Sequence, residues 1–193
     1  KWIDNVPSLL HLWYAGQEGG TAVAEILFGK VNPSGKLPIS FEKKWEDNPA
    51  YPYYYDVDGD KRVEYKEGLF MGYRHYDVSE TKAQFAFGYG MSYTTFKYSD
   101  LRIDREKGRD LVVKIRFTVK NTGKHDGAET AQVYIRPINP KVERPYKELK
   151  GFAKHFIRKN TVQEIEITLD KDAFSYYKTE LKDFDYDVGS DEA

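Results

Sequence analysis

The sequence contains no cysteine, so disulfides, thiolate nucleophiles and cysteine-ligated metal sites are excluded. It also lacks an apolar run of about 18 residues, the length that a membrane-spanning helix requires. Its 30 Lys and Arg residues are balanced by 31 Asp and Glu residues, whereas a protein that mainly grips nucleic acid carries a basic excess. The opening residues, Lys1 to Asp4, do not form the apolar centre of a secretory leader. We therefore expect neither a nucleic-acid partner nor a membrane partner.

Aromatic side chains, in contrast, are abundant. They make up 16% of the 193 residues, and 16 of them are tyrosines. Because disordered chains are poor in aromatic residues, we expect a globular chain with one good-sized core or two small ones. Tyrosine offers a wide apolar face with a polar tip, which suits sugar-binding surfaces, protein interfaces and β-sandwich cores alike. Composition alone therefore does not name a function.

Residues 1–41 have the pattern of an α/β unit. Ser8 to Tyr14 is a short apolar run without alternation, which is typical of a strand buried on both faces of a parallel sheet. A glycine-rich turn follows it, and the apolar spacing from Thr21 to Phe28 predicts a helix that Gly29 ends. Lys36 to Phe41 predicts a second strand, which its internal proline places at an edge or an end. Because one helix cannot cover both faces of such a sheet, we interpret this unit as the end of a larger α/β-sandwich domain.

Residues 42–95 are expected to form a long irregular connector, and such stretches are usually functional or interdomain. The aromatic cluster from Tyr51 to Tyr55 suits stacking on a sugar ring, and it suits packing against a neighbouring domain equally well. Between Gly68 and Tyr93, glycines alternate with aromatic residues and permit close approach of the backbone. Within this segment, we expect Arg74 to hold the connector against the α/β unit through a carboxylate or backbone carbonyls.

From about Phe96 the apolar period changes to two, which indicates antiparallel strands. The alternation is clearest in residues 111–119, 131–136 and 164–169. A turn at residues 121–123 and a proline-rich loop at residues 137–145 separate these runs. Half-buried strands between polar turns are typical of an antiparallel β-sandwich.

Carboxylate pairs could perform glycoside hydrolysis, which needs two positioned acids. Ahead of the sandwich, the glutamates considered for such a pair are Glu18, Glu25, Glu64 and Glu67. Their spacing defines no acid–nucleophile arrangement, and the sequence contains neither a GxSxG nor an HExxH motif. We therefore assign no catalytic residue within this chain, and the substrate-binding residues stay unknown.

One acidic segment has part of the spacing of a calcium-binding loop. Asp56, Asp58, Asp60 and Glu67 fall at its positions 1, 3, 5 and 12. The glycine required at position 6 is replaced by Lys61, and no helices are predicted to flank the loop, so we interpret it as an acidic loop without a metal. The histidines fit no metal site either: His11, His75, His125 and His155.

Several motifs resemble those of glycoside hydrolase family 3. They are residues 13–20 (WYAGQEGG), 24–29 (AEILFG), 32–38 (NPSGKLP), 65–77 (YKEGLFMGYRHYD), 87–96 (FGYGMSYTTF), 119–123 (VKNTG) and 143–152 (ERPYKELKGF). The resemblance follows one order along nearly the whole chain. For β-glucosidase-like members it implies a (β/α)8 barrel, an α/β-sandwich domain and a fibronectin type III-like domain. It also implies retaining hydrolysis of terminal β-linked glucosides or related sugars, with no metal and no cofactor.

On this resemblance the chain is a C-terminal fragment: residues 1–41 end the α/β-sandwich domain, 42–95 form the connector, and 96–193 form the fibronectin type III-like domain. The family's Asp nucleophile lies on the barrel and its Glu acid/base lies upstream of residues 13–20. Neither role therefore passes to a residue of this chain, Glu18 included. The implied partners are the remainder of the enzyme, or a second copy, and a carbohydrate substrate of the whole enzyme. The resemblance favours a periplasmic or secreted location.

The resemblance departs from the family pattern at the last strand of the sandwich. Family members close the sandwich with a strand after a segment like Phe184 to Gly189, whereas this sequence reads Ser190 to Ala193 there. We therefore expect an absent or altered closing strand. A second function also stays open, a stand-alone accessory module that binds a carbohydrate or a protein. An acid/base-like context upstream of Lys1 favours the enzyme, and an initiating methionine just before Lys1 favours the module.

Overall fold

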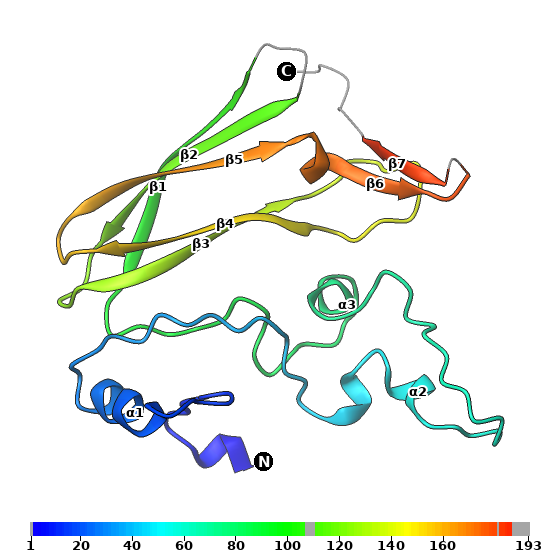
Figure 1. Ribbon diagram of the computed structural model, residues 1–193, viewed down its shortest axis with the longest axis horizontal. Coiled ribbons are helices and arrows are strands. Elements are labelled where there is room, and N and C mark those ends of the chain that lie inside the picture. Colours follow the sequence, from blue (N-terminus) through cyan, green and yellow to red (C-terminus); the bar gives the residue numbers. More distant parts are fainter. Residues whose placement is uncertain (1, 107–110, 181, 187–193) are drawn as a thin grey trace.

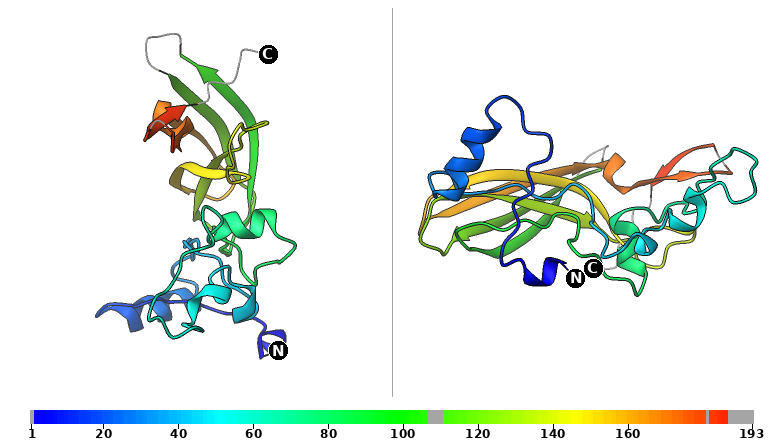
Figure 2. Two further views of the ribbon diagram at one scale, coloured as in Figure 1. Left: turned by 90° about the vertical axis from the view of Figure 1, so that its right-hand side faces the viewer. Right: turned by 90° about the horizontal axis from the view of Figure 1, so that it is seen from below.

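The computed structural model describes residues 2–106, 111–180 and 182–186, and it divides visibly into two parts (Figure 1). The part up to residue 95 consists of short helices and irregular segments, and the part from Phe96 onward consists mainly of β-strands. Figure 2 shows that the helical part lies along one side of the β-sheets. None of the described helices is both long and apolar enough to cross a membrane.

The helices of the first part are short. They are η1 (Trp2–Asn5), α1 (Gly19–Leu27), η2 (Trp45–Asp47), α2 (Tyr51–Tyr54) and α3 (Tyr73–Val78). The helix predicted after the glycine-rich turn is confirmed by α1. It also ends as predicted, because Gly29 adopts a φ of 73°, a left-handed conformation that favours glycine after a helix.

The strand predicted from Ser8 to Tyr14 is wrong for this structure, in which the segment is irregular. A strand of a parallel sheet needs neighbours that accept and donate its backbone hydrogen bonds. No described segment of this chain pairs with residues 8–14. As a result Leu9 is 54% exposed and Trp13 is 50% exposed.

The strand predicted from Lys36 to Phe41 is reduced to a single β-bridge between Phe41 and Phe85. Near it, the Leu37 backbone donates to Tyr89 O over 2.8 Å, and the Gly88 backbone donates to Leu37 O over 2.7 Å. Pro38 interrupts regular pairing because it has no backbone N–H to donate. The segment therefore runs beside the end of the connector without forming a sheet.

The predicted antiparallel sandwich is confirmed. Its strands are β1 (Phe96–Arg105), β2 (Val112–Asn121), β3 (Gly127–Ile135), β4 (Glu148–Ile157) and β5 (Val162–Asp170). One sheet has the order β1-β2-β5 and the other contains β3 and β4. The three alternating runs correspond to β2, β3 and β5, and the loop predicted over residues 137–145 separates β3 from β4.

The core lies between these two sheets. On β2 and β5, alternate apolar side chains point inward and are at most 7% exposed: Ile115, Phe117, Val119, Ile165, Ile167 and Leu169. Ala131 and Ile157 meet them from the other sheet. Burial of each large side chain contributes about 1.5–3 kcal/mol, so this layer is the main source of stability in the sandwich.

A close approach of the two sheets requires glycine at position 151. A Cβ atom on Gly151 would lie 2.7 Å from Ile167 Cγ2 and 3.1 Å from a Leu169 methyl carbon. Strand β4 therefore packs directly over β5 at this point.

The described chain ends with a small hairpin beyond the sandwich. It consists of η3 (Lys171–Phe174), β6 (Ser175–Lys178) and β7 (Asp183–Tyr186), and β6 pairs antiparallel with β7. The carboxylate of Asp170 caps η3 by accepting from the backbone of Asp172 over 3.0 Å. The absent or altered closing strand that the sequence predicts falls largely on residues 187–193, which lie outside the described residues.

Candidate functional site

Two adjoining cavities lie in the connector, where η2, α2 and α3 come together. Their volumes are about 200 Å³ and about 310 Å³. Asn48, Pro49 and Glu67 line both of them. Tyr76 adds to the lining of the first, and His75 adds to that of the second. The neighbouring residues of α3 thus face two different cavities.

The polar groups of the first cavity hold one another in place. The Asn48 side chain donates to Glu42 Oε1 over 3.4 Å, and its Oδ1 accepts from the Ala50 backbone over 3.0 Å. The Tyr76 hydroxyl donates to the Asp47 backbone carbonyl over 3.4 Å. Burial raises the pKa of Tyr76, and the carboxylates of Glu42 and Asp47 raise it further. Tyr76 therefore acts here as a neutral hydrogen-bond donor.

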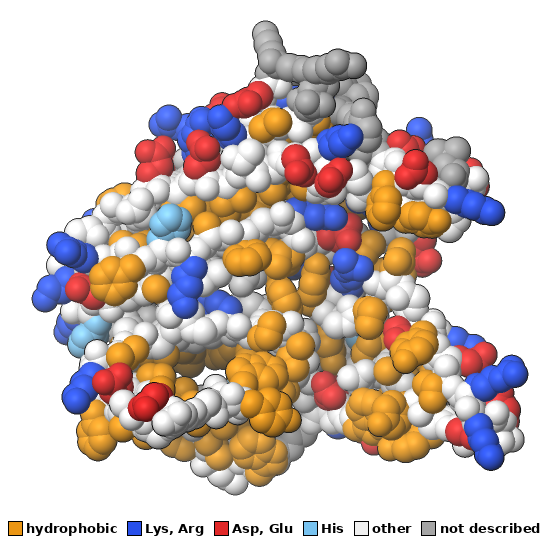
Figure 3. Space-filling model, in the orientation of Figure 1, with side chains coloured by type: hydrophobic (Ala, Val, Ile, Leu, Met, Phe, Trp, Pro, Cys, Tyr) orange, Lys and Arg blue, Asp and Glu red, His pale blue; other side chains and the backbone are white. Residues whose placement is uncertain are grey.

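Aromatic rings form a cluster beside the second cavity. Trp45 makes edge-to-face contacts with Tyr51 and Tyr54, with ring centroids 5.8 Å and 5.2 Å apart. Tyr54 meets Tyr55 in the same way at 5.1 Å. Tyr54 and Tyr55 nevertheless stay 56% and 60% exposed. Figure 3 shows hydrophobic side chains gathered over the lower half of the molecule, which contains the N-terminal segment and the connector. Both predicted roles, sugar stacking and packing against a further domain, remain compatible with this exposure.

The candidate glutamates have separate local roles. Glu18 accepts from the Thr21 hydroxyl over 3.1 Å at the start of α1. Glu64 forms an ion pair with Lys66 in the connector. Glu25 lies on α1 and Glu67 lines the two cavities. The absence of a catalytic residue from this chain stays a prediction.

Three of the four acids with calcium-loop spacing do come together. Carboxylate oxygens of Asp56, Asp58 and Asp60 lie within 4.8 Å of one another in an exposed loop, and Glu67 lies outside this group. Backbone N–H groups of the same loop donate to all three; for example, Gly59 donates to Asp56 Oδ1 over 2.7 Å. These bonds account for the arrangement as a tight acidic turn.

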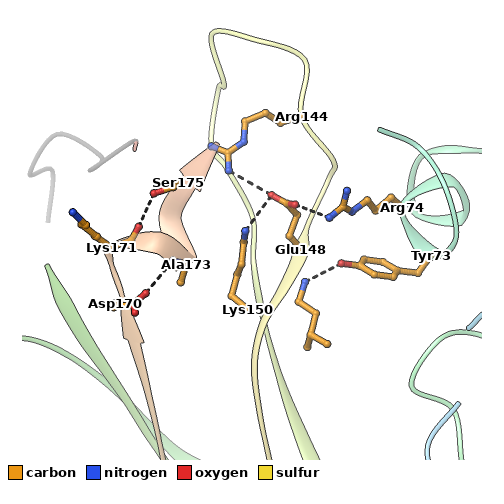
Figure 4. Close-up of polar contacts among 10 residues, drawn as sticks. Tyr73, Arg74, Arg144, Glu148, Lys150, Asp170, Lys171, Ala173 and Ser175 are labelled. Atoms are coloured by element: carbon orange, nitrogen blue, oxygen red, sulfur yellow. Dashed lines mark hydrogen bonds and ion pairs between the residues drawn. The ribbon is translucent and has the colours of Figure 1, made fainter. Parts of the chain in front are cut away.

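The contact predicted for Arg74 joins a different pair of elements from those expected. Arg74 does bind a carboxylate, but that carboxylate belongs to Glu148 on β4, at 2.9 Å, and not to the α/β unit (Figure 4). The prediction was wrong about the partner element because the sequence gave no sign of which carboxylate, 74 residues away, would lie opposite.

Glu148 is the centre of a cationic cluster that sequence reasoning missed. Besides Arg74, its carboxylate meets Arg144 at 3.6 Å and Lys150 at 3.7 Å (Figure 4). The Arg144 side chain is only 6% exposed and lies 4.8 Å from the ring centroid of Tyr176 on β6. One carboxylate therefore joins α3, the loop before β4 and β4 itself. The only sequence signal was the density of charges in residues 143–152.

Further contacts reinforce this junction between the connector and the sandwich. The Tyr73 hydroxyl accepts from the Leu149 backbone over 2.9 Å, and its ring packs against Tyr134 with centroids 5.9 Å apart. Burial raises the pKa of Tyr134, and the charges near it raise it further. Lys147 pairs with Asp77 on α3 at 3.1 Å. The junction is therefore built on paired charges and aromatic rings, and it fixes α3, which lines the cavities, against β4.

Comparison with known proteins gives two domain matches. The family model of the glycosyl hydrolase family 3 C-terminal domain matches residues 1–93. The model of the fibronectin type III-like domain matches residues 129–190.

Whole-protein relatives match almost the entire chain. A thermostable β-glucosidase B of Acetivibrio thermocellus is 46% identical over 97% of this chain and 25% of the relative's length. The crystal structure of a Kluyveromyces marxianus β-glucosidase in complex with glucose superposes with a TM-score of 0.86 at 43% identity, over 95% of this chain and 22% of the other. The glucose complex of Thermotoga neapolitana β-glucosidase 3B gives a TM-score of 0.83 at 36% identity, over 90% of this chain and 24% of the other. The chain thus spans about a quarter of the length of these relatives and matches their C-terminal portion.

Proposed function

Because this chain belongs to glycosyl hydrolase family 3, we propose that it works as the C-terminal part of a retaining β-glucosidase-like hydrolase. The substrates of that hydrolase would be terminal β-linked glucosides or related sugars. The observation that supports this proposal most strongly is the match of nearly the whole chain to β-glucosidases, in sequence and in three dimensions.

The nucleophile and the acid/base of the proposed enzyme come from the part of the protein outside this chain. Retaining hydrolysis needs two carboxyl groups about 5–5.5 Å apart across the scissile bond. The glutamates available here are engaged locally, since Glu18 holds the start of α1 and Glu64 pairs with Lys66. We therefore assign to this chain a supporting role, with the division into residues 1–41, 42–95 and 96–193 that the sequence predicts.

The remainder of the enzyme is the proposed partner of the N-terminal segment. Leu9, Leu10, Leu12 and Trp13 are between 38% and 54% exposed, although a domain of the α/β class buries such side chains. An exposed apolar patch of this kind marks an interface. The missing cover would be the upstream part of the α/β-sandwich domain.

An assay of aryl β-glucoside hydrolysis tests the proposal. The intact protein that contains this chain should hydrolyse the substrate, and the purified 193-residue chain should not. Turnover by the purified chain that disappears on Glu18→Gln or Glu67→Gln substitution would show that the catalytic acids lie here after all. An intact protein without glycosidase activity would overturn the proposed function itself.

A second candidate function, an accessory module that binds a carbohydrate, is favoured by the aromatic cluster beside the 310 Å³ cavity. Titration of the intact protein with cello-oligosaccharides, followed by tryptophan fluorescence, examines it. Binding that is lost on Tyr54→Ala substitution, with hydrolysis unchanged, would support the module. Absence of binding outside the hydrolytic site would reject it.

A further inference from the structure

The sandwich is closed on one side and open on the other. In the three-stranded sheet, β2 lies in the middle, with β5 on one side and β1 on the other. The core-facing side chains of β5, namely Ile165, Ile167 and Leu169, are at most 7% exposed. On β1, Tyr98 is 46% exposed and Ile103 is 65% exposed.

These two β1 side chains belong to the core face. Tyr98 is the register partner of Val119, which is fully buried, and Ile103 is the partner of Ile115, which is 6% exposed. Residues directly opposite each other in an antiparallel pair point to the same face of the sheet. Leu101, which is 65% exposed, lies between them where the register shifts. The apolar core face therefore continues onto β1, but nothing in the described chain covers it there.

The reason is a difference in strand number between the two sheets. In the described residues, three strands face a sheet of two, β3 and β4. Strand β4 lies over β5, as the close approach of Gly151 to Ile167 and Leu169 requires. Strand β3 is the nearer one to β1, because the Tyr98 hydroxyl reaches Glu129 Oε1 on β3 over 3.1 Å. The place opposite Leu101 and Ile103, beyond the unpaired edge of β3, is therefore where a third strand would lie.

We propose that one further β-strand of the same protein, from the polypeptide beyond Tyr186, pairs antiparallel with the free edge of β3 and covers Tyr98, Leu101 and Ile103. An unpaired edge beside an apolar face is the combination that strand addition satisfies, since the edge supplies backbone hydrogen bonds and the face supplies pockets for alternate side chains. The added strand would carry apolar residues at every second position.

The course of the chain supports this choice of occupant. Tyr186 pairs with Ser175, which follows η3 directly after Asp170. Asp170 is the register partner of Val112, and Arg105 at the end of β1 pairs with the next residue, Val113. The polypeptide thus leaves β7 at the end of the sandwich where β1 ends.

Strand β3 ends on the same side. Its last residue, Ile135, pairs with Glu148, and Arg144 joins Glu148 to Tyr176 on β6. Figure 1 shows β6 and β7 beyond this end of the sheets. A strand that starts here and runs along the β3 edge is antiparallel to β3 and needs no crossover.

The test uses the intact protein and does not depend on its catalytic activity. Ile103→Lys places a charge on the covered face and should lower the melting temperature by about 4 °C or more. Val162→Lys is the matched control, because Val162 is also β-branched, lies on the same sheet at 57% exposure, and pairs with the exposed Lys120. It should leave the melting temperature within about 1 °C.

Hydrogen exchange of the unsubstituted protein keeps the proposal falsifiable if Ile103→Lys fails to fold. Consecutive amides of β3 should be protected, both those that face β4 and those that face the other edge. Fast exchange at alternate β3 positions, together with a silent Ile103→Lys variant, would overturn the proposal. Protection of the β3 edge that grows with protein concentration would overturn it too, because the occupant would then be a second copy.

Discussion

Arg74 on helix α3 donates from Nη2 to Glu148 Oε1 on strand β4 over 2.9 Å, and this contact ties the connector to the sandwich. Glu148 is 14% exposed at its side chain and is also within 4 Å of Arg144 and Lys150. A single carboxylate therefore balances three cations. Removal of the carboxylate leaves three positive charges close together, whereas removal of one cation leaves two partners in place.

The two partners should consequently differ in their effect on stability. Glu148→Gln should lower the free energy of unfolding by about 2–4 kcal/mol, because it leaves the nearly buried Arg144 without its carboxylate. Arg74→Ala should cost only about 1 kcal/mol. Urea denaturation measures both, and Arg62→Ala, at an 83% exposed side chain, is the control. In the intact protein Arg74→Ala should leave the Michaelis constant nearly unchanged; a large rise with unaltered melting would assign Arg74 to substrate binding.

Asn121 is the second polar residue whose loss should be costly, since it is fully buried at the end of β2. Its Nδ2 donates to His125 O over 2.8 Å and to Ile157 O over 2.9 Å, and its Oδ1 accepts from the Thr94 hydroxyl over 2.6 Å. Asn121→Leu strands these groups in the interior, and it should lower the free energy of unfolding by about 3 kcal/mol or more. Chemical denaturation measures the loss. Gln163→Ala, at an exposed position, should change it by less than about 0.5 kcal/mol. Equal stability of the two variants would contradict a central role for Asn121.

Alternation was a reliable guide only where one face of a strand is buried and the other is wet. On β2, Ile115, Phe117 and Val119 follow this rule, and the strand was predicted from the sequence. Strand β1 escaped notice because two residues, Asp100 and Leu101, stand opposite the single residue Phe117, so the apolar positions lose their period of two. Strand β4 escaped because Phe152 and Phe156 lie exposed on its outer face while Ala153 and Ile157 pack inward.

The contacts that position the candidate site were beyond sequence reasoning for a different reason. A charged residue in a motif reveals its charge but not its partner, because the partner depends on how distant segments pack. Arg74 and Glu148 lie 74 positions apart. The cavities around Glu67 depend in the same way on the meeting of three short helices, and no local pattern predicts that meeting.

Stability should also fall in alkaline solution because of Tyr98. Burial raises the pKa of Tyr98, and the carboxylate of Glu129, which accepts its hydrogen bond over 3.1 Å, raises it further. The unfolded chain releases this proton near pH 10, whereas the folded chain retains it. Stability from this group is therefore complete below about pH 10 and is lost as the pH rises through the folded-state pKa.

Tyr98→Phe should make this loss smaller. The measurement is the free energy of unfolding from urea denaturation at several values between about pH 9 and pH 11.5. The variant should show a shallower decline than the unsubstituted chain, and the exposed-site variant Tyr54→Phe should leave the decline as it was. An identical slope in the Tyr98→Phe variant would show that Glu129 and burial do not govern this residue.

The N-terminal segment and the sandwich should differ most clearly in local stability. Leu9, Leu10, Leu12 and Trp13 lie in irregular backbone and stay between 38% and 54% exposed, so their amides have no sheet to protect them. Strand β2 is paired on both sides, with β1 and β5, and its inward side chains form the core. Local opening of the first segment therefore costs little, whereas exposure of β2 requires unfolding of the sandwich.

Hydrogen exchange on the 193-residue chain measures this difference. Amides of residues 112–121 should exchange at least about 10³-fold more slowly than unstructured peptides, and amides of residues 9–14 should exchange at close to the unstructured rate. In the intact protein, where we propose that the upstream α/β domain covers the segment, residues 9–14 should become protected while β2 changes little. A monodisperse 193-residue monomer with equal protection in both regions would contradict this outcome. It would mean that Leu9 to Trp13 find their own cover within the chain and that the α/β unit needs no partner.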